Sequence, residues 1–484
     1  MDQTLGGRCM APRTYREFDL LVEDPSHDAS GLRSLTVRLL ASPAGEHDPV
    51  ERRLTPKLAG ELATGLAALE ARSLDIAGVV GLGAALADLL LPSGIRAKLV
   101  ESRNRLGADE GLRVRLRLDP DLAELPWEFA WVAQQAGLLD ASGFLALDPR
   151  ISIVRHETVG GPVAVDPAPR ERLIVAALAN PEIPGRAPLN LAAEKLNLEQ
   201  ALKTVPRMTV SFVDAPTIDN VQDALLDGAD VFHFAGHGVA DSLVIVDDTG
   251  APSELTATLL AQHVTGRGVQ LVVLGACESG MRAIRDRWSG VATRLIAAGV
   301  PAVVAMQFRI ADRAAIAFSD RLYRSLAGGG SLDQAVSDAR LAVLNLASAG
   351  RDEAKRARLW RDWGVPVLYL RPDAAVSLAS VEDEQTRETM VEEATAIARV
   401  RVEDVEKNGK VVGAEVGVLT AGSVTAEVVA KRVEGLVVGL VIDRVDAGSA
   451  KADLEVGDVS GQVVGMKIEN VGGPAPPKRR PKDR

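Results

Sequence analysis

Two short segments of the sequence combine a reactive side chain with flanking glycines. The segment VFHFAGHG ends in His237-Gly238, and the segment VVLGACESG contains Cys277. A thiol is a weak nucleophile at neutral pH, and a neighbouring imidazole activates it by taking its proton. The pair therefore fits nucleophilic catalysis, with His237 as general base and Cys277 as nucleophile. The backbone amides of Gly238 and Cys277 are then available to hold an oxyanion.

Other interpretations of the same residues stay open. A cysteine at the end of a strand is more often a small buried hydrophobe than a nucleophile. His233 is a competing base, but it lies inside the same apolar run as His237, and we expect it to be buried structurally. Zinc binding is not expected, because neither a second cysteine nor a suitably spaced histidine completes a ligand set. The stretch FAGHGVAD lacks the glycine spacing of a dinucleotide-binding loop, and no cofactor is predicted.

The elements that must position the pair are apolar strands that alternate with helical patterns. We expect strands at 173–179, 208–214, 231–236, 270–276, 302–308 and 365–370. Near-continuous apolar strands separated by helices predict an α/β fold with a mostly parallel sheet covered by helices on both faces. His237 and Cys277 follow two of these strands. Because the carboxyl ends of parallel strands meet at one edge of a sheet, we expect the two side chains to lie close together.

The region before this alternation is mixed α/β. Strands are expected at 18–23, 35–40, 112–118 and 151–156, and helices at 58–69 and 75–91. Between 112 and 118, leucine and valine alternate with arginine. This alternation is typical of a strand with one face buried and one face solvated.

The C-terminal part carries an internal repeat. From Gly409 a glycine recurs every thirteen residues, and alternate units resemble each other most, so the higher period is twenty-six. Each unit supplies a short β-branched strand and a glycine suited to a tight turn. Stacked units predict a small β-repeat, solenoid-like domain. A coincidental array of hairpins is the alternative.

Composition shifts along the chain divide it into seven parts. We expect a disordered N-terminus (1–16), a mixed α/β region (17–159), a linker (160–172), the main α/β domain (173–372), an acidic helical linker (373–395), the repeat domain (396–474) and a basic disordered tail (475–484).

Overall composition excludes several classes of function. A net charge of −11 and only 3% aromatic residues argue against nucleic-acid binding, which requires cationic and stacking side chains. No uninterrupted apolar run reaches the roughly 18 residues of a membrane span. Two cysteines give no disulfide framework, and a reducing cytoplasm is therefore the expected compartment.

Beyond the two reactive segments, the sequence resembles the CHAT family of caspase-like cysteine peptidases, which are relatives of separase and the caspases. GVATRLIAAGVPAVVAMQFRIAD, LYRSLAGGGSLDQAVSDAR and WGVPVLYL follow the family's later blocks in order, and the resemblance runs from Phe18 to Arg371. It implies a caspase-like fold and cleavage of a protein substrate through an acyl-thioenzyme, without metal or cofactor. It also implies oxyanion donors at Gly238 and Cys277, and a regulated role in bacterial defence or cell death.

The same resemblance bears on substrate preference. Asp312 occupies the position at which separase-like relatives carry an acid that binds a basic P1 side chain. Its position also suits a cap for a helix beginning near Arg313, and Glu278 and Asp286 are alternative acids. A catalytically silent CHAT-fold scaffold remains the competing function. In either case the repeats are a candidate binding module for an activator or an inhibitory partner.

Overall fold

The computed structural model describes residues 13–23, 34–133, 141–157, 172–186, 188–203, 208–239, 241–276, 289–348, 360–371, 374 and 376, and the backbone of six strands between 395 and 471. The chain forms two compact units, Met1–Ser380 and Val381–Arg484. Each unit is described by itself.

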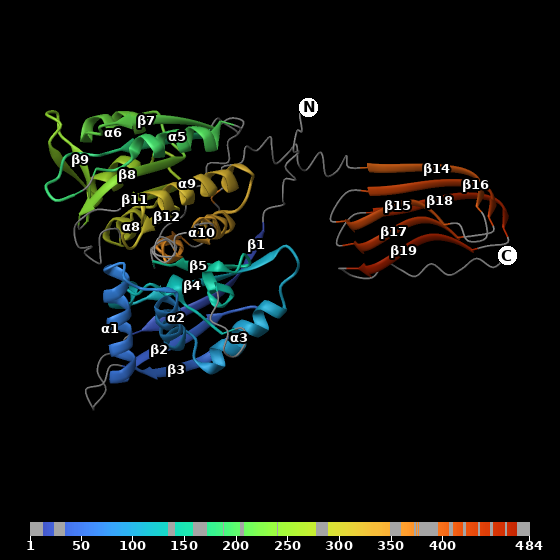
Figure 1. Ribbon diagram of the computed structural model, residues 1–484, viewed down its shortest axis with the longest axis horizontal. Helices are drawn as coiled ribbons and strands as arrows, with labels where there is room; N and C mark the ends of the chain where they lie inside the picture. The colour runs from blue at the N-terminus through green and yellow to red at the C-terminus, as the bar shows by residue number, and fades with distance from the viewer. Residues whose placement is uncertain are drawn as a thin grey trace. The chain divides into compact units, whose positions relative to one another are not determined.

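The first unit is built on a single mixed sheet, which has thirteen strands in the described part of the chain (Figure 1). Its main path runs β10-β9-β8-β11-β12-β13-β5-β4-β1-β2-β3, and β6 joins it beside β8 with β7 outside β6. The two halves of the sheet meet where β13 (Pro366–Leu370) pairs with β5 (Ile151–Arg155). The mixed region and the main α/β domain therefore share one sheet.

The first half contains every strand and helix expected from the sequence, and three more. Its elements are β1 (Thr14–Glu23), β2 (Ser34–Ala41), β3 (His47–Arg53), α1 (Pro56–Glu70), α2 (Ile76–Leu90), α3 (Ser93–Asn104), β4 (Glu110–Leu118), α4 (Pro120–Ala123) and β5. Strand β3 and helices α3 and α4 were not predicted. Parallel pairing of β1 with β4 places the first strand of the unit in the middle of this half of the sheet.

The second half confirms the predicted alternation. Its elements are β6 (Arg172–Leu178), α5 (Leu191–Leu202), β7 (Met208–Asp214), α6 (Ile218–Leu226), β8 (Val231–Val239), β9 (Ser242–Val246), β10 (Pro252–Thr256), α7 (Ala257–Val264), β11 (Leu271–Ala276), α8 (Ser289–Ala297), β12 (Ala302–Met306), α9 (Asp312–Ala327), α10 (Leu332–Ser348) and β13. Only the hairpin strands β9 and β10 were missed, and β13 runs antiparallel to β12.

The order of the parallel strands reverses once, between β6 and β8. The chain passes from β6 outward to β7 and then returns to β8 on the other side of β6. With right-handed crossovers, this reversal puts α5 on one face and α6, α7 and α8 on the other. Helix α9 packs on both α5 and α10, and α7 packs on α8. The sheet is thus covered on both faces, as predicted.

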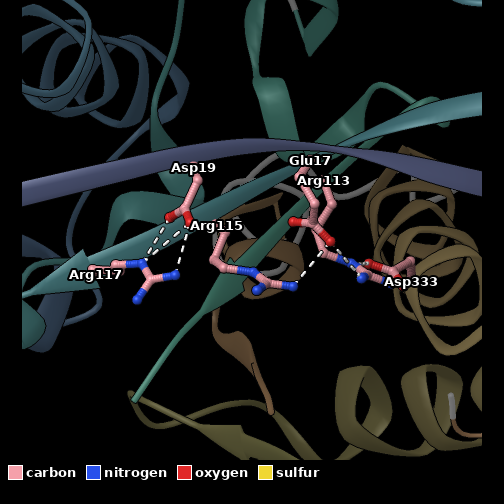
Figure 2. A network of polar contacts seen from close by, with 6 residues as sticks. All are labelled: Glu17, Asp19, Arg113, Arg115, Arg117 and Asp333. Carbon is pink, nitrogen blue, oxygen red and sulfur yellow. Dashed lines mark hydrogen bonds and ion pairs between the residues drawn. The ribbon is translucent and has the colours of Figure 1, made fainter. Parts of the chain in front are cut away.

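One face of β1 and β4 carries charges instead of apolar side chains (Figure 2). Arg117 holds Asp19 through Nε and Nη2, at 2.9 and 2.8 Å, and Arg113 holds Asp333 of α10 through the same pair of nitrogens. Arg115, which is only 8% exposed, donates to Glu17 at 2.9 Å. The prediction of a solvated face is therefore wrong. These cations are enclosed and paired with acids from β1 and from α10.

The pairing shifts the pKa values of the groups involved. Burial lowers the pKa of Arg113, but the hydrogen bond to Asp333 and its charge more than offset this, so the net pKa is raised. The hydrogen bond to Asp19 raises the pKa of Arg117. Burial, followed by the charge of Asp333, raises the pKa of the neighbouring Tyr15 to about 12. Arg113 and Arg117 therefore keep their charge at neutral pH, and Tyr15 keeps its proton.

The second unit contains two three-stranded parallel sheets. One is made of β14 (Thr395–Val405), β16 (Ser423–Val433) and β18 (Ser449–Val459), and the other of β15 (Lys410–Leu419), β17 (Leu436–Val445) and β19 (Gln462–Val471). From β15 and β16 onward, partners within a sheet are twenty-six residues apart, for example Ser423 with Ser449. Alternate units of the sequence repeat therefore pair with each other.

Within the residues that the structure describes, no single helix is long and apolar enough to cross a membrane. Helices α2 and α3 pass the same test of length and composition only as a pair, which is bent by 97°.

Candidate active site

The strands that lead to His237 and Cys277 are parallel neighbours. In the register of β8 and β11, Val273 lies beside His233 and Ala276 lies beside Gly236. Both strands are apolar and almost completely buried, as expected for strands covered by helices on both faces. The predicted adjacency of the two strands is confirmed. The segment of the chain that leads into Cys277 thus runs beside the one that leads into His237.

Cys277 itself follows Ala276 and lies outside the described residues, as do the alternative acids Glu278 and Asp286. No geometry of the thiol enters the description of the site.

His237 lies inside β8 and not after it. The strand continues to Val239 because β9 pairs antiparallel with its last residues, with His237 opposite Val244 and Gly238 opposite Leu243. This extension holds the backbone on both sides of the imidazole in a ladder of hydrogen bonds. His237 is 2% exposed. The histidine is therefore rigidly placed and enclosed.

His233 is buried structurally, as expected. It is completely buried, and its Nδ1 lies 3.0 Å from the hydroxyl of Tyr323 on α9. Its Nε2 lies 3.4 Å from a carboxylate oxygen of Glu194 on α5. Burial, followed by the charge of Glu194, raises the pKa of Tyr323 well above its usual value. The three side chains connect β8 to two helices on one face of the sheet, four residues before His237.

Asp312 follows the next parallel strand of the sheet. Strand β12 pairs with β11, and α9 begins at Asp312 itself, with Ala311 as its N-cap. The alternative that Asp312 caps a helix beginning near Arg313 is therefore wrong, because Asp312 is already the first helical residue. It is half-buried. A carboxylate at this position still has a favourable interaction with the helix dipole.

The connection between β12 and α9 is fixed by contacts with the first half of the sheet. The side chain of Gln307 donates to the carbonyl of Glu124 at 2.7 Å, and it accepts from Arg155 at 3.0 Å. Arg155 is buried and paired with Glu128 at 2.8 Å. The backbone of Ala311 donates to the buried carboxylate of Asp362. The carboxyl end of β12 therefore has little freedom to move.

Sequence reasoning missed one residue at this edge, Arg186. It lies in the loop after β6, and its Nη1 donates to the carbonyl of Gly238 at 3.4 Å. Nothing in the loop sequence NPEIPGRAPL marks it as functional. Only the strand order, in which β6 lies directly beside β8, could have indicated it. Among the described residues, no group of His, Cys, Asp and Glu side chains is arranged to hold a metal ion.

These features define a doubly wound α/β protein with an enclosed histidine at the carboxyl edge of its sheet, an architecture that fits the caspase-like fold. The CHAT domain family model matches residues 80–369, which is more than half of the chain. The chain therefore belongs to the CHAT domain family. No curated protein matches it.

Several solved structures are similar at low identity. A chain of the Saccharomyces cerevisiae separase–securin complex matches with a TM-score of 0.34 and 14% identity, over 57% of this chain and 16% of that one. The Arg-specific cysteine proteinase gingipain R matches with a TM-score of 0.37 and 12% identity, over 59% and 68%. The Porphyromonas gingivalis complex of RgpB pro- and mature domains matches with a TM-score of 0.37 and 11% identity, over 59% and 70%. The match spans only a small part of the separase chain.

Proposed function

We propose that the protein is a cysteine endopeptidase with His237 as general base and Cys277 as nucleophile. The observation that carries the proposal is the parallel register of β8 and β11, in which Gly236 and Ala276, the residues before the pair, lie side by side. Membership of the CHAT domain family supports it.

The proposed reaction proceeds in two steps. His237 takes the proton of the thiol, and the thiolate attacks the carbonyl carbon of the scissile peptide bond. Backbone N–H groups of Gly238 and Cys277 hold the resulting oxyanion, and the imidazolium then protonates the leaving amine. Water, activated by His237, hydrolyses the acyl-thioenzyme and releases the second product.

We further propose that Asp312 selects a basic P1 side chain. Its half-buried carboxylate follows β12, the strand next to β11 in the sheet, so it lies at the same carboxyl edge as His237. Three further proposals go beyond the site. Family resemblance supports a protein substrate and a role in bacterial defence or cell death. The low cysteine content supports action in the cytoplasm, and the sequence repeat supports regulation by a partner bound to the second unit.

The test is turnover of a fluorogenic peptide library varied at P1. We expect cleavage after Arg or Lys, a fall of at least about 10³-fold in Cys277→Ala and His237→Ala, and loss of the basic preference in Asp312→Asn. Cys9→Ala and His47→Ala are the matched controls, because each removes the same side-chain type elsewhere in the chain.

Cleavage that survives Cys277→Ala contradicts the mechanism. The assay is repeated on the protein without residues 381–484. If both proteins are folded and neither cleaves any peptide, the result favours the alternative of a CHAT-fold scaffold. Activity that appears only without the second unit assigns that unit a restraining role.

A further inference from the structure

The loop that follows β6 stands at the reversal of strand order. In open α/β sheets, ligands bind in the crevice outside the carboxyl ends of the strands at such a point. Here the crevice lies between the ends of β6 and β8, so the loop from Asn180 to Leu189 faces His237-Gly238. Asn180 closes this loop, because its side chain both donates to the carbonyl of Leu189 (3.3 Å) and accepts from its amide (3.1 Å).

Arg186 reaches from this loop across the crevice. Its Nη1 donates to the carbonyl of Gly238, while its Nε is buried and has no hydrogen-bond partner in the described part of the chain. Nor does any carboxylate among those residues lie within ion-pair distance of it. Burial lowers the pKa of this guanidinium, because no such charge offsets the loss of solvation. Arg186 thus carries a half-buried positive charge beside the proposed general base.

The edge of Arg186 that has no partner among the described residues is formed by Nε and Nη2. Other arginines of this protein bind carboxylates through the same edge. Arg113 and Arg117 each hold an acid through Nε and Nη2 (Figure 2), and Arg155 holds Glu128 in the same way. Because Gly238 uses Nη1 of Arg186, the Nε–Nη2 edge remains for a ligand. A guanidinium fork of this kind matches the two oxygens of a carboxylate.

The loop also forms a pocket that an incoming group can enter. The pocket has a volume of about 560 Å³, with Pro181, Ile183, Pro184 and Pro188 in its walls and Arg186 in its lining. This is the size range of small-ligand sites. Buried Arg340 makes a useful contrast. It also lacks a carboxylate partner within the described ranges, but it is fully buried and donates to the carbonyl of Pro366.

We propose that Arg186 forms a subsite for a carboxylate of the peptide substrate, next to the scissile bond on the β6 side of His237. The carboxylate comes from an Asp or Glu side chain or from a free peptide C-terminus. This inference deepens the proposed peptidase function and rests on it. Together with Asp312 on the β12 side, the subsite selects substrates that carry opposite charges on the two sides of the catalytic pair.

The test is a set of peptides that differ by Glu or Gln at each position flanking the cleaved bond, each made with a C-terminal acid and with a C-terminal amide. We expect the wild type to prefer one carboxylate by about 10- to 100-fold in kcat/KM, the range of a charge-assisted hydrogen bond. Arg186→Met removes this preference, so that the ratio of kcat/KM between the acidic peptide and its neutral counterpart falls to about 1. Arg186→Lys keeps a smaller part of the preference, because the charge remains and the fork is lost.

Two control variants separate the subsite from net charge and from a structural role. Lys203→Met removes an exposed positive charge at the end of α5 and should leave the preference intact. Glu182→Gln removes the one acid in the pocket lining and should increase the preference, because it no longer repels the ligand. A merely structural role for Arg186 lowers turnover of acidic and neutral peptides equally, and that result overturns the subsite.

The remaining outcomes separate a failure of the subsite proposal from a failure of the peptidase proposal. Turnover without a carboxylate preference, or a preference that survives Arg186→Met, overturns the subsite proposal and leaves the peptidase proposal unaffected. If neither the wild type nor the protein without residues 381–484 cleaves any peptide, the peptidase proposal fails, and fluorescence anisotropy with the same labelled peptides decides on the subsite. Tighter binding of the carboxylate peptide that Arg186→Met abolishes supports it, and equal binding of both peptides overturns it.

Discussion

The two halves of the large sheet solve the same packing problem in different ways. In the second half, strands β8, β11 and β12 are mostly apolar on both faces, and the buried polar side chains of β8 are His233 and His237. In the first half, one face of β1 and β4 buries a row of arginines and acids (Figure 2). The apolar half is stabilised mainly by burial of apolar side chains, whereas the charged half depends on each ion keeping its partner.

The contrast explains which cations are candidates for binding. The arginines of β4 are enclosed, but each already holds a carboxylate of β1 or α10, so we assign them a structural role. Arg186 lies in the apolar half, lines a pocket and has no acid partner among the described residues. An unpaired charge in a place that solutes can reach distinguishes a recognition residue from a structural one.

Among the variants considered, Asp333→Ala should destabilise the charged half of the sheet most strongly. Asp333 is 2% exposed and accepts two hydrogen bonds from Arg113, so the substitution leaves a buried guanidinium with only its contact to Glu17. We expect the free energy of unfolding to fall by about 3–5 kcal/mol, measured by urea denaturation at pH 7.

The double variant Arg113→Met with Asp333→Leu sharpens this test. Replacing both ions by apolar groups of similar size removes the unpaired charge, and stability should return to within about 1–2 kcal/mol of the wild type. A single variant that is as stable as the wild type would show that the pair contributes little.

The charged half should also make the protein sensitive to acid. Burial, and then the charges of Arg117 and Arg115, lower the pKa of His156 from 6.5 to about 4. Between these values the unfolded chain binds a proton that the folded protein does not, so stability falls as the pH is lowered. Between pH 7 and pH 5 we expect a loss of about 2 kcal/mol from this group.

His156→Gln isolates that contribution, because it removes the titrating ring and keeps a polar side chain at the site. The difference in unfolding free energy between the two proteins should shrink from pH 7 to pH 5. Parallel curves would mean that His156 titrates alike in the folded and unfolded states.

Most elements of the fold could be predicted because their strands are buried on both faces and read as apolar runs. Strand β3 was missed, since its sequence HDPVERR carries a proline and five charged or polar residues, which only an edge strand tolerates. The β8–β9 hairpin was missed because its turn lacks the usual Asn-Gly signal, although Asp241 adopts a φ of +54° there. Local sequence gave no sign of either element.

The site was predictable only in part, for a related reason. Adjacent carboxyl ends follow from the order of apolar strands, so the pairing of the strands before His237 and Cys277 could be predicted. Arg186 could not, because its role depends on the reversal that places β6 beside β8. The solvation of the arginine face was predicted wrongly, since alternation does not reveal that Asp333, 220 residues from Arg113, covers that face.

The smallest expected effect concerns a polar cluster inside the apolar half. Tyr323→Phe removes the hydroxyl that bonds to Nδ1 of His233, and the ring still fills the same space. We expect a loss of about 1–2 kcal/mol in the free energy of unfolding, because a buried histidine nitrogen is left without its partner. Glu194 still contacts the other ring nitrogen, so the strand should remain in place and kcat of any peptidase activity should change less than about threefold. A large fall in kcat with unchanged stability would instead mean that His233 and Tyr323 act on His237, and would move this cluster from the structural to the functional side of the comparison.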